Sequence, residues 1–266
     1  MSRAAFFAAL FGATAVALAF LVLPVVAIFA HVSPVTLAAQ LTNPVVDDAL
    51  RVSAVTILEA QALVLLLGTP AAYFLATRRF RGRAVVVTAV ELPLVLPPAV
   101  AGIGLLVAFG RSGLVHTSVA FTQLAVTLAV AFVSGPLYLR AAIAAFEAVD
   151  PSLVDASRTL GAGPARTFFR VVLPLARGGL SAGEALAFAR GLGEFGATIM
   201  FAGSLQGVTQ TLPLAIYSEF DVNLDVTLAI SGLLVLISAA VLVALKVASA
   251  WTLSPQSFGF RFARST

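Results

Sequence analysis

The sequence predicts an all-α integral membrane protein with six transmembrane helices and a cytoplasmic two-helix loop between the fourth and fifth spans. Of its 266 residues, 60% are hydrophobic and only 11% are charged, whereas soluble proteins carry about 25% charged residues. Six apolar runs reach the roughly 20 residues that a helix needs to cross about 30 Å of hydrocarbon. Because lipid cannot hydrogen-bond to backbone groups, each run is expected to be helical.

The six runs divide the chain into three parts. An N-terminal span and its outer loop occupy residues 1–48, five spans form a core over residues 49–250, and residues 251–266 form a short cytoplasmic tail. The first run is too long for a secretory signal, so a retained helix is expected. The expected spans cover residues 5–29, 49–76, 85–109, 119–142, 182–202 and 226–247.

The basic residues predict the orientation of the chain. Most of them fall on one side of the six-span pattern, whereas the opposite loops carry several acidic residues and few basic ones. Cytoplasmic loops are enriched in Lys and Arg, so both termini are expected in the cytoplasm of a multi-pass membrane protein. The pI near 10.3 therefore needs no nucleic acid to explain it. The basic side carries Arg3, Arg78, Arg79, Arg81, Arg83, Arg140, Arg158, Arg166, Arg170, Arg177, Lys246, Arg261 and Arg264.

The composition argues against catalysis by this chain. The sequence contains no cysteine, so thiolate metal sites and cysteine nucleophiles are excluded. Its two histidines, His31 and His116, are expected at outer boundaries and do not form a ligand cluster. There is no G-x4-G-K-[S/T] phosphate loop, and Lys246 is the only lysine. We therefore expect no catalytic residues, no metal and no cofactor in this chain.

The cytoplasmic loop, at about residues 147–176, has clear helix boundaries. Asp150-Pro151 is typical of a helix start, and Gly161 is typical of a helix end. A second helix is expected to start at Gly163-Pro164 and to stop at Pro174, before the fifth span begins. From these features alone, an amphipathic hairpin lying on the membrane surface is an alternative interpretation.

The motif Asp155-Ala-Ser-x3-Gly161-x9-Val171-x-Leu173-Pro174 resembles the cytoplasmic EAA loop of ABC importer permeases. The spacing matches throughout, while Asp155, Ser157 and Val171 replace Glu, Ala and Ile. The resemblance implies that a short helix docks onto a separate ATPase subunit, which carries ATP and Mg. It assigns this coupling role to Asp155, Ala156, Ser157, Gly161, Leu173 and Pro174.

A second motif resembles the molybdate branch of these permeases. It comprises Gly193-Glu-Phe-Gly-Ala-Thr-Ile-Met-Phe-Ala-Gly203 and Thr209-Gln-Thr-Leu-Pro-Leu-Ala-Ile-Tyr217, and Leu92-Pro-Leu-Val-Leu-Pro-Pro98 also fits. The likeness spans about residues 49–246, the family's type-1 transmembrane core. It implies import of molybdate or tungstate across a prokaryotic inner membrane, with sulfate or thiosulfate as the alternative.

The resemblance also implies partners and a mechanism. We expect two copies of the ATPase, an extracytoplasmic oxyanion-binding protein, and alternating access. One six-span chain is too small to enclose a pathway comfortably, and symmetric dimers are the commonest oligomers, so a second copy of the chain is expected. A secondary transporter or a membrane-embedded enzyme is the alternative from a different class.

Several residues inside the predicted spans are candidates for the pathway or its gate. Pro97 and Pro98 should break the third span, and Gly196 belongs to a glycine-rich fifth span that packs closely or bends. Arg190 and Glu194, four residues apart, are expected to pair on one helix face, with a role at the inner gate as the alternative.

Hydroxyl and amide side chains near the outer end of the fifth span suit a tetrahedral dianion, because they bind it without a full opposite charge. The alternative is that they cap the helix and face the binding protein. These candidates are Thr198, Ser204, Thr209, Gln210 and Thr211.

Overall fold

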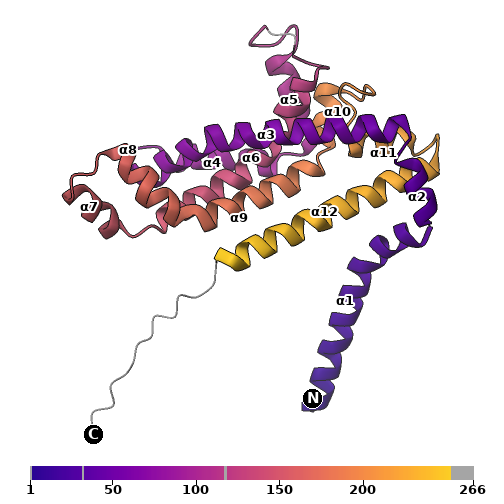
Figure 1. Ribbon diagram of the computed structural model, residues 1–266, viewed down its shortest axis with the longest axis horizontal. Coiled ribbons are helices and arrows are strands. Elements are labelled where there is room, and N and C mark those ends of the chain that lie inside the picture. Colours follow the sequence, from indigo (N-terminus) through magenta and orange to yellow (C-terminus); the bar gives the residue numbers. More distant parts are fainter. Residues whose placement is uncertain (1, 32, 117–118, 253–266) are drawn as a thin grey trace. The chain divides into compact units, whose positions relative to one another are not determined.

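The computed structural model describes residues 2–31, 33–116 and 119–252, and every regular element within these ranges is a helix (Figure 1). The predicted tail overlaps the end of the last helix, and residues 253–266 lie outside the described ranges. The elements are α1 (Arg3–His31), α2 (Pro34–Gln40), α3 (Pro44–Thr77), α4 (Arg83–Val95), α5 (Pro98–Phe109), α6 (Gln123–Glu147), α7 (Pro151–Thr159), α8 (Pro164–Thr167), the π-helical turn η1 (Phe168–Val172), α9 (Leu173–Leu192), α10 (Gly196–Ala202), α11 (Leu212–Glu219) and α12 (Leu224–Thr252).

The all-helical membrane fold is confirmed, and the third span is bent. Among the described residues, five helical segments are long and apolar enough to cross a membrane, and the bent pair α4 and α5 raises the number to six when it counts as one span. The pair is bent by 115° at residues 96 and 97. Pro97 and Pro98 explain the break, because proline lacks a backbone N–H and disfavours helix in the residue before it.

The fifth span begins earlier than predicted. Pro164–Leu192 forms one span-length helical segment, so the prediction that Pro174 stops a separate helix is wrong. The backbone N–H of Leu173 donates to the carbonyl of Phe168, five residues back. This wider π turn changes the hydrogen-bond register directly before Pro174, so the proline is accommodated without ending the helix.

The fifth span also ends earlier than predicted. α9 stops at Leu192, and a non-helical stretch separates it from the short helix α10. The expected continuous run over residues 182–202 is therefore divided in two. Gly193 is in this stretch, and glycine weakens a helix because it loses the most conformational freedom on folding.

The described residues form two compact units. The first contains the residues up to Ala60, Leu96–Val133 and Leu192–Ala239, and the second contains Gln61–Val95, Ser134–Gly191 and the residues from Ala240 onward. The residues of α3, α6, α9 and α12 are divided between them. Each unit has its own packing, and each contains one of the candidate regions described below.

The first unit has an apolar core where the beginning of α3, α11 and the beginning of α12 meet. A hydrogen bond joins two of these helices, since the backbone N–H of Leu212 donates to Ser53 Oγ at 2.8 Å. Such a bond satisfies one of the free N–H groups at the start of α11. The core consists of the buried residues Val46, Ala49, Leu212, Ala215, Val226 and Ile230.

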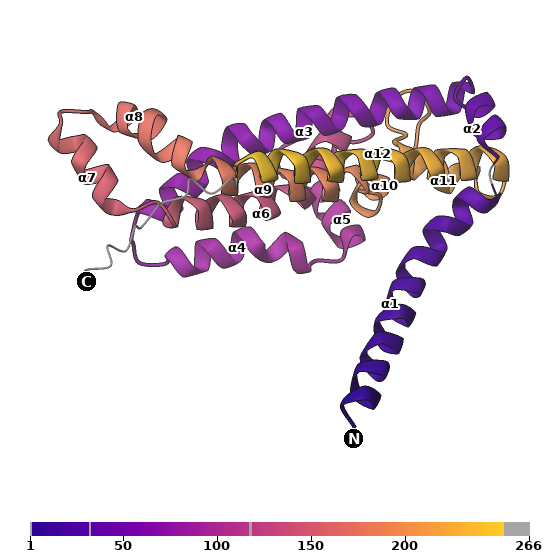
Figure 2. The ribbon, with the colours of Figure 1, turned by 60° about the horizontal axis from the view of Figure 1, so that its bottom comes forward.

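In the second unit α3, α6 and α9 pack closely side by side, as Figures 1 and 2 both show. Small residues permit this approach. A Cβ atom on Gly68 would lie 2.9 Å from Leu139, and one on Gly179 would lie 2.5 Å from Ala145 Cβ. Tyr138, only 1% exposed, hydrogen-bonds Thr69 across the same contact at 2.6 Å.

Candidate functional site

The predicted start and end of the α7 helix are confirmed. The Asp150 side chain accepts a hydrogen bond from the Ser152 backbone N–H at 2.8 Å, and Pro151 occupies the first helical position. This hydrogen bond lowers the pKa of the Asp150 carboxyl. At the other end, Leu160 caps the helix and Gly161 has a φ of +82°. Glycine adopts this left-handed conformation without steric cost, so it ends the helix sharply.

A short connection joins α7 to α8. Ser157 Oγ lies 3.1 Å from Thr167 Oγ1, and the two hydroxyls form a hydrogen bond. Thr167 is only 2% exposed, so this hydrogen bond ties α7 to a buried point on the following helix. The Ala162 backbone N–H also donates to the Ser157 carbonyl. The two helices therefore form a hairpin whose arms are joined by side-chain as well as backbone contacts.

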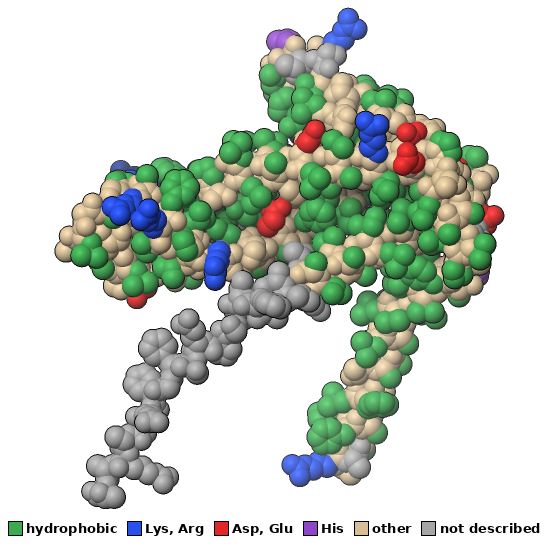
Figure 3. Space-filling view, viewed as in Figure 1, with side chains coloured by type: hydrophobic (Ala, Val, Ile, Leu, Met, Phe, Trp, Pro, Cys, Tyr) green, Lys and Arg blue, Asp and Glu red, His purple; other side chains and the backbone are tan. Residues whose placement is uncertain are grey.

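The surface of α7 is largely exposed and partly apolar. Asp155 and Ala156, both predicted coupling residues, are exposed, and Asp155 forms an ion pair with Arg158 at 3.6 Å. Leu160, next to the helix, is 88% exposed. Figure 3 shows basic side chains gathered over this hairpin together with apolar ones. Such a mixture is typical of a surface that binds another protein.

An aromatic cluster anchors the base of the hairpin. The ring of Phe168, at the start of η1, lies 4.7 Å from Tyr73 of α3 and 6.2 Å from Phe146 of α6, measured between centroids. Tyr73 and Phe146 pack edge to face at 5.4 Å. Each such pair contributes about 0.5–1.5 kcal/mol beyond its buried area. The predicted coupling residues Leu173 and Pro174 follow directly in α9, where Leu173 is half-buried and Pro174 exposed.

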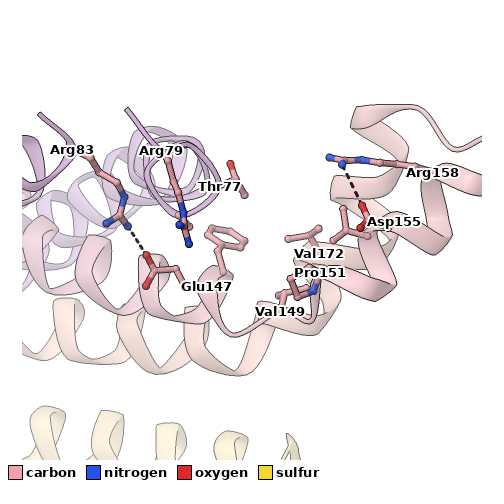
Figure 4. A pocket seen from close by; sticks show the side chains of 12 residues that line it. Thr77, Arg79, Arg83, Glu147, Val149, Pro151, Asp155, Arg158 and Val172 are labelled. Atoms are coloured by element: carbon pink, nitrogen blue, oxygen red, sulfur yellow. Dashed lines mark hydrogen bonds and ion pairs between the residues drawn. The ribbon is translucent and has the colours of Figure 1, made fainter. Parts of the chain in front are cut away.

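A cavity of about 730 Å³ separates α7 from the ends of α3 and α6 (Figure 4). Arg83 and Glu147 point toward each other on one wall and form an ion pair. Arg79 also lines this wall, and Asp155 and Arg158 line the wall formed by α7. In the sequence, the basic run that contains Arg79 and Arg83 indicates only the orientation of the chain. No local pattern in the sequence places these two residues beside α7.

The second candidate region lies in the first unit, where α5 crosses α10. A Cβ atom on Gly102 would lie 2.5 Å from the Ala197 carbonyl oxygen, and one on Gly196 would lie 2.6 Å from Pro98 Cβ. The two glycines therefore allow backbone contact between short helices that follow a break in the chain. Pro97, Pro98 and Gly196, three of the predicted pathway candidates, belong to this crossing.

Glu194 caps α10. Its side chain is buried, at 2% exposed for the residue, and accepts a hydrogen bond from the Ala197 backbone N–H at 2.7 Å. A carboxylate in this position satisfies one of the free N–H groups at a helix start. Because α9 ends at Leu192, Arg190 and Glu194 do not share one continuous helix, so the word intrahelical no longer applies to the predicted pair.

The structure divides the predicted hydroxyl and amide residues into two groups. Ser204 and Thr209 hold the segment between α10 and α11, since Ser204 hydrogen-bonds Ser218 and the Leu205 N–H donates to Thr209 Oγ1. In the described part of the chain, the other three predicted residues each have a buried side-chain oxygen without a hydrogen-bond partner, although buried polar groups are usually paired. They are Thr198 Oγ1, Gln210 Oε1 and Thr211 Oγ1.

These two regions offer different kinds of binding surface. Within the described ranges, no three His, Cys, Asp or Glu side chains gather closely enough to hold a metal ion. The hairpin presents an exposed surface, while the crossing presents buried hydroxyls beside a broken span. One region suits a protein partner, and the other suits a small polar ligand.

Residues 68–251 match the family described as binding-protein-dependent transport system inner membrane component. The molybdenum transport system permease protein ModB of Mycobacterium bovis is 44% identical over 84% of this chain and 87% of its own length. A probable molybdenum ABC transporter permease protein of Haloferax volcanii is 40% identical over 85% and 83%. In fold, the chain is similar to a bacterial ABC transporter involved in alginate import, with TM-score 0.65, 13% identity, and coverage of 96% and 99%.

Proposed function

The chain belongs to the family of binding-protein-dependent transport system inner membrane components, and from this premise we propose that it is the permease of an ATP-driven importer of molybdate. The assignment of molybdate as the substrate rests on the likeness, over most of the chain, to relatives named for molybdenum transport. Tungstate has the same charge and shape and is a second substrate. Sulfate and thiosulfate are the alternative that an uptake assay must exclude.

The permease works with separate partners. Two copies of an ATPase subunit bind ATP and Mg on the cytoplasmic side, and an extracytoplasmic binding protein delivers the oxyanion. A second copy of this chain completes the pathway on a two-fold axis. The chain crosses the inner membrane of a prokaryote with both termini in the cytoplasm, and this orientation puts the α7–α8 hairpin on the side of the ATPase.

The α7–α8 hairpin is the coupling element. The exposed face of α7, with Asp155 and Ala156, docks onto the ATPase. Movement of α7 reaches α8 through the bond between Ser157 and Thr167, and then reaches α3 and α6 through the aromatic cluster around Phe168. Closure of the two ATPase subunits would thereby rock these helices and alternate access to the two sides of the membrane.

The buried hydroxyls of Thr198 and Thr211 contact the oxyanion on its way through the membrane. Hydroxyl groups donate hydrogen bonds to a dianion without holding it by a full charge, and a transport site must release its ion. The alternative role, in which such residues cap a helix and face the binding protein, is favoured for Ser204 and Thr209. Both of these hydroxyls already have partners, since Ser204 bonds Ser218 of α11 and Thr209 accepts from the Leu205 N–H.

The test is uptake by the complete transporter in vesicles. The chain is reconstituted with its ATPase and binding protein, and ATP-dependent molybdate uptake is measured with tungstate or sulfate as competitor. We expect inhibition by tungstate and none by sulfate. Dominant inhibition by sulfate would assign the protein to sulfate import, and uptake driven by an ion gradient without the ATPase would identify a secondary transporter.

A further inference from the structure

Two ion pairs connect α4 to α6 in the second unit. Arg83 pairs with Glu147 near the ends of the helices, and Glu91 pairs with Arg140 farther along both of them. The second pair lies eight residues along α4 and seven along α6, which is about 10–12 Å at 1.5 Å per residue. Glu91 and Arg140 both lie in helical segments that are long and apolar enough to cross a membrane, with α4 counted together with α5.

The side chains of the Glu91–Arg140 pair are exposed to an unusual degree for charged groups inside a membrane span. The Arg140 side chain is 71% exposed and the Glu91 side chain is 39% exposed. Charged side chains inside spans almost always face a bundle interior or a water-filled cavity, because exposure to lipid is unfavourable. The α4–α6 surface around Arg140 is therefore expected to face water in the assembled transporter.

Glu91 does not occupy the hydrogen-bond donors of Arg140. The distance between Arg140 Nε and Glu91 Oε1 is 3.7 Å, which is too long for a hydrogen bond. The planar guanidinium group keeps its donors for another acceptor, and its geometry suits two oxygens of a tetrahedral oxyanion. The nearby Glu91 carboxylate weakens the attraction for an anion, and weak attraction favours release.

We propose that Arg140, on the exposed α4–α6 surface, is a contact site for the transported oxyanion in the inner half of the pathway, with Glu91 as the counterion that the oxyanion displaces. This inference rests on the proposed function, since it assigns a further residue to the same pathway. The site takes the oxyanion class in general, so molybdate and tungstate bind it alike. An anionic lipid headgroup has the same chemistry and must be distinguished by experiment.

The absence of cysteine from the sequence allows a direct test. Glu91→Cys is introduced into the full chain, assembled with its ATPase in inside-out vesicles, and treated with membrane-impermeant thiosulfonates that carry either a negative or a positive charge. We expect rapid labelling, about tenfold faster with the negative reagent because of Arg140. Adding Arg140→Gln should remove this preference. Leu66→Cys, at a position that is 73% exposed in α3, is the apolar control and should label slowly.

Competition identifies the ligand. Millimolar molybdate should slow the labelling of Glu91→Cys by the negatively charged reagent. It should have no effect on labelling once Arg140→Gln is added. Failure of Glu91→Cys to label, or a charge preference that survives Arg140→Gln, would overturn the proposal. Protection that requires phosphatidylglycerol in the vesicles, and that molybdate does not reproduce, would assign Arg140 to lipid binding instead.

A transport assay separates this inference from the proposed function. Arg140→Gln should lower ATP-driven molybdate uptake about tenfold, while Arg140→Lys should retain part of it and Arg177→Gln should leave it unchanged. Full uptake by Arg140→Gln would refute the contact site and leave the importer intact. Failure of the unmutated transporter to take up molybdate would refute the proposed function, whatever the labelling result.

Discussion

The hairpin of the second unit and the helix crossing of the first unit are stabilised in different ways. The hairpin exposes its face and is held at its base by aromatic rings, whereas the crossing of α5 and α10 buries its polar groups and depends on glycine contacts. The hairpin can therefore change its partner contacts without disturbing a core. The crossing has no such freedom, because a Cβ atom added at Gly102 would lie only 2.5 Å from the Ala197 carbonyl oxygen.

The largest effect is expected from adding a methyl group at the crossing. Gly102→Ala would place a carbon 2.5 Å from the Ala197 carbonyl oxygen, whereas nothing lies within 4 Å of the same atom in Gly104→Ala. Overpacking of this kind costs about 1–3 kcal/mol. Thermal denaturation in detergent should show a lower midpoint for Gly102→Ala only. Equal midpoints for the two variants would mean that the crossing tolerates movement.

The aromatic anchor should affect coupling more than docking. Phe168→Ala removes contacts with Tyr73 and Phe146, whereas Phe169→Ala truncates a neighbouring ring that is 63% exposed. We expect Phe168→Ala to retain its ATPase but to hydrolyse ATP with little uptake. Phe169→Ala should keep a normal ratio of uptake to hydrolysis. If the two variants show the same ratio, the anchor does not transmit movement.

The end of α7 should depend on backbone conformation alone. Gly161 has a φ of +82°, and no atom lies within 4 Å of the position that an added Cβ would take. Gly161→Ala therefore introduces backbone strain without a steric clash. The left-handed conformation costs a non-glycine residue about 1–2 kcal/mol. Gly163→Ala is the matched control, because it also has open space and its φ is −68°. Copurification should show weaker ATPase retention only for Gly161→Ala, and equal retention would argue against docking by α7.

The smallest effects should separate the two groups of hydroxyl residues. Thr209→Val removes the acceptor of the Leu205 N–H and should cost about 1 kcal/mol of stability. Thr198→Val removes a buried hydroxyl that has no recorded partner, so stability should be unchanged while maximal uptake falls severalfold. Unchanged uptake by Thr198→Val would remove this residue from the pathway.

The sequence predicted the hairpin better than the crossing, because the two depend on information at different ranges. The boundaries of α7 follow from Asp150, Pro151 and Gly161, which act within a few residues of themselves. The crossing joins Gly102 to Ala197, far apart in the chain, and no local pattern indicates that contact.

The same distinction explains the incorrect predictions. Pro174 was expected to end a helix on local grounds, but the π turn before it accommodates the ring. Arg190 and Glu194 have the spacing of a helical pair, but α9 ends at Leu192 and the two residues do not share one helix. A spacing of four residues places two side chains on one helix face only where the helix is continuous.

The central claim is that the exposed face of α7 contacts the ATPase. Ala156→Cys, in this cysteine-free sequence, can carry a photoreactive maleimide, and Arg111→Cys on the segment after α5 serves as the control. In vesicles with the assembled transporter, illumination should link the Ala156 position to the ATPase and stop uptake, whereas the Arg111 position should give no ATPase adduct. Efficient labelling at Ala156 without any ATPase adduct would contradict the account.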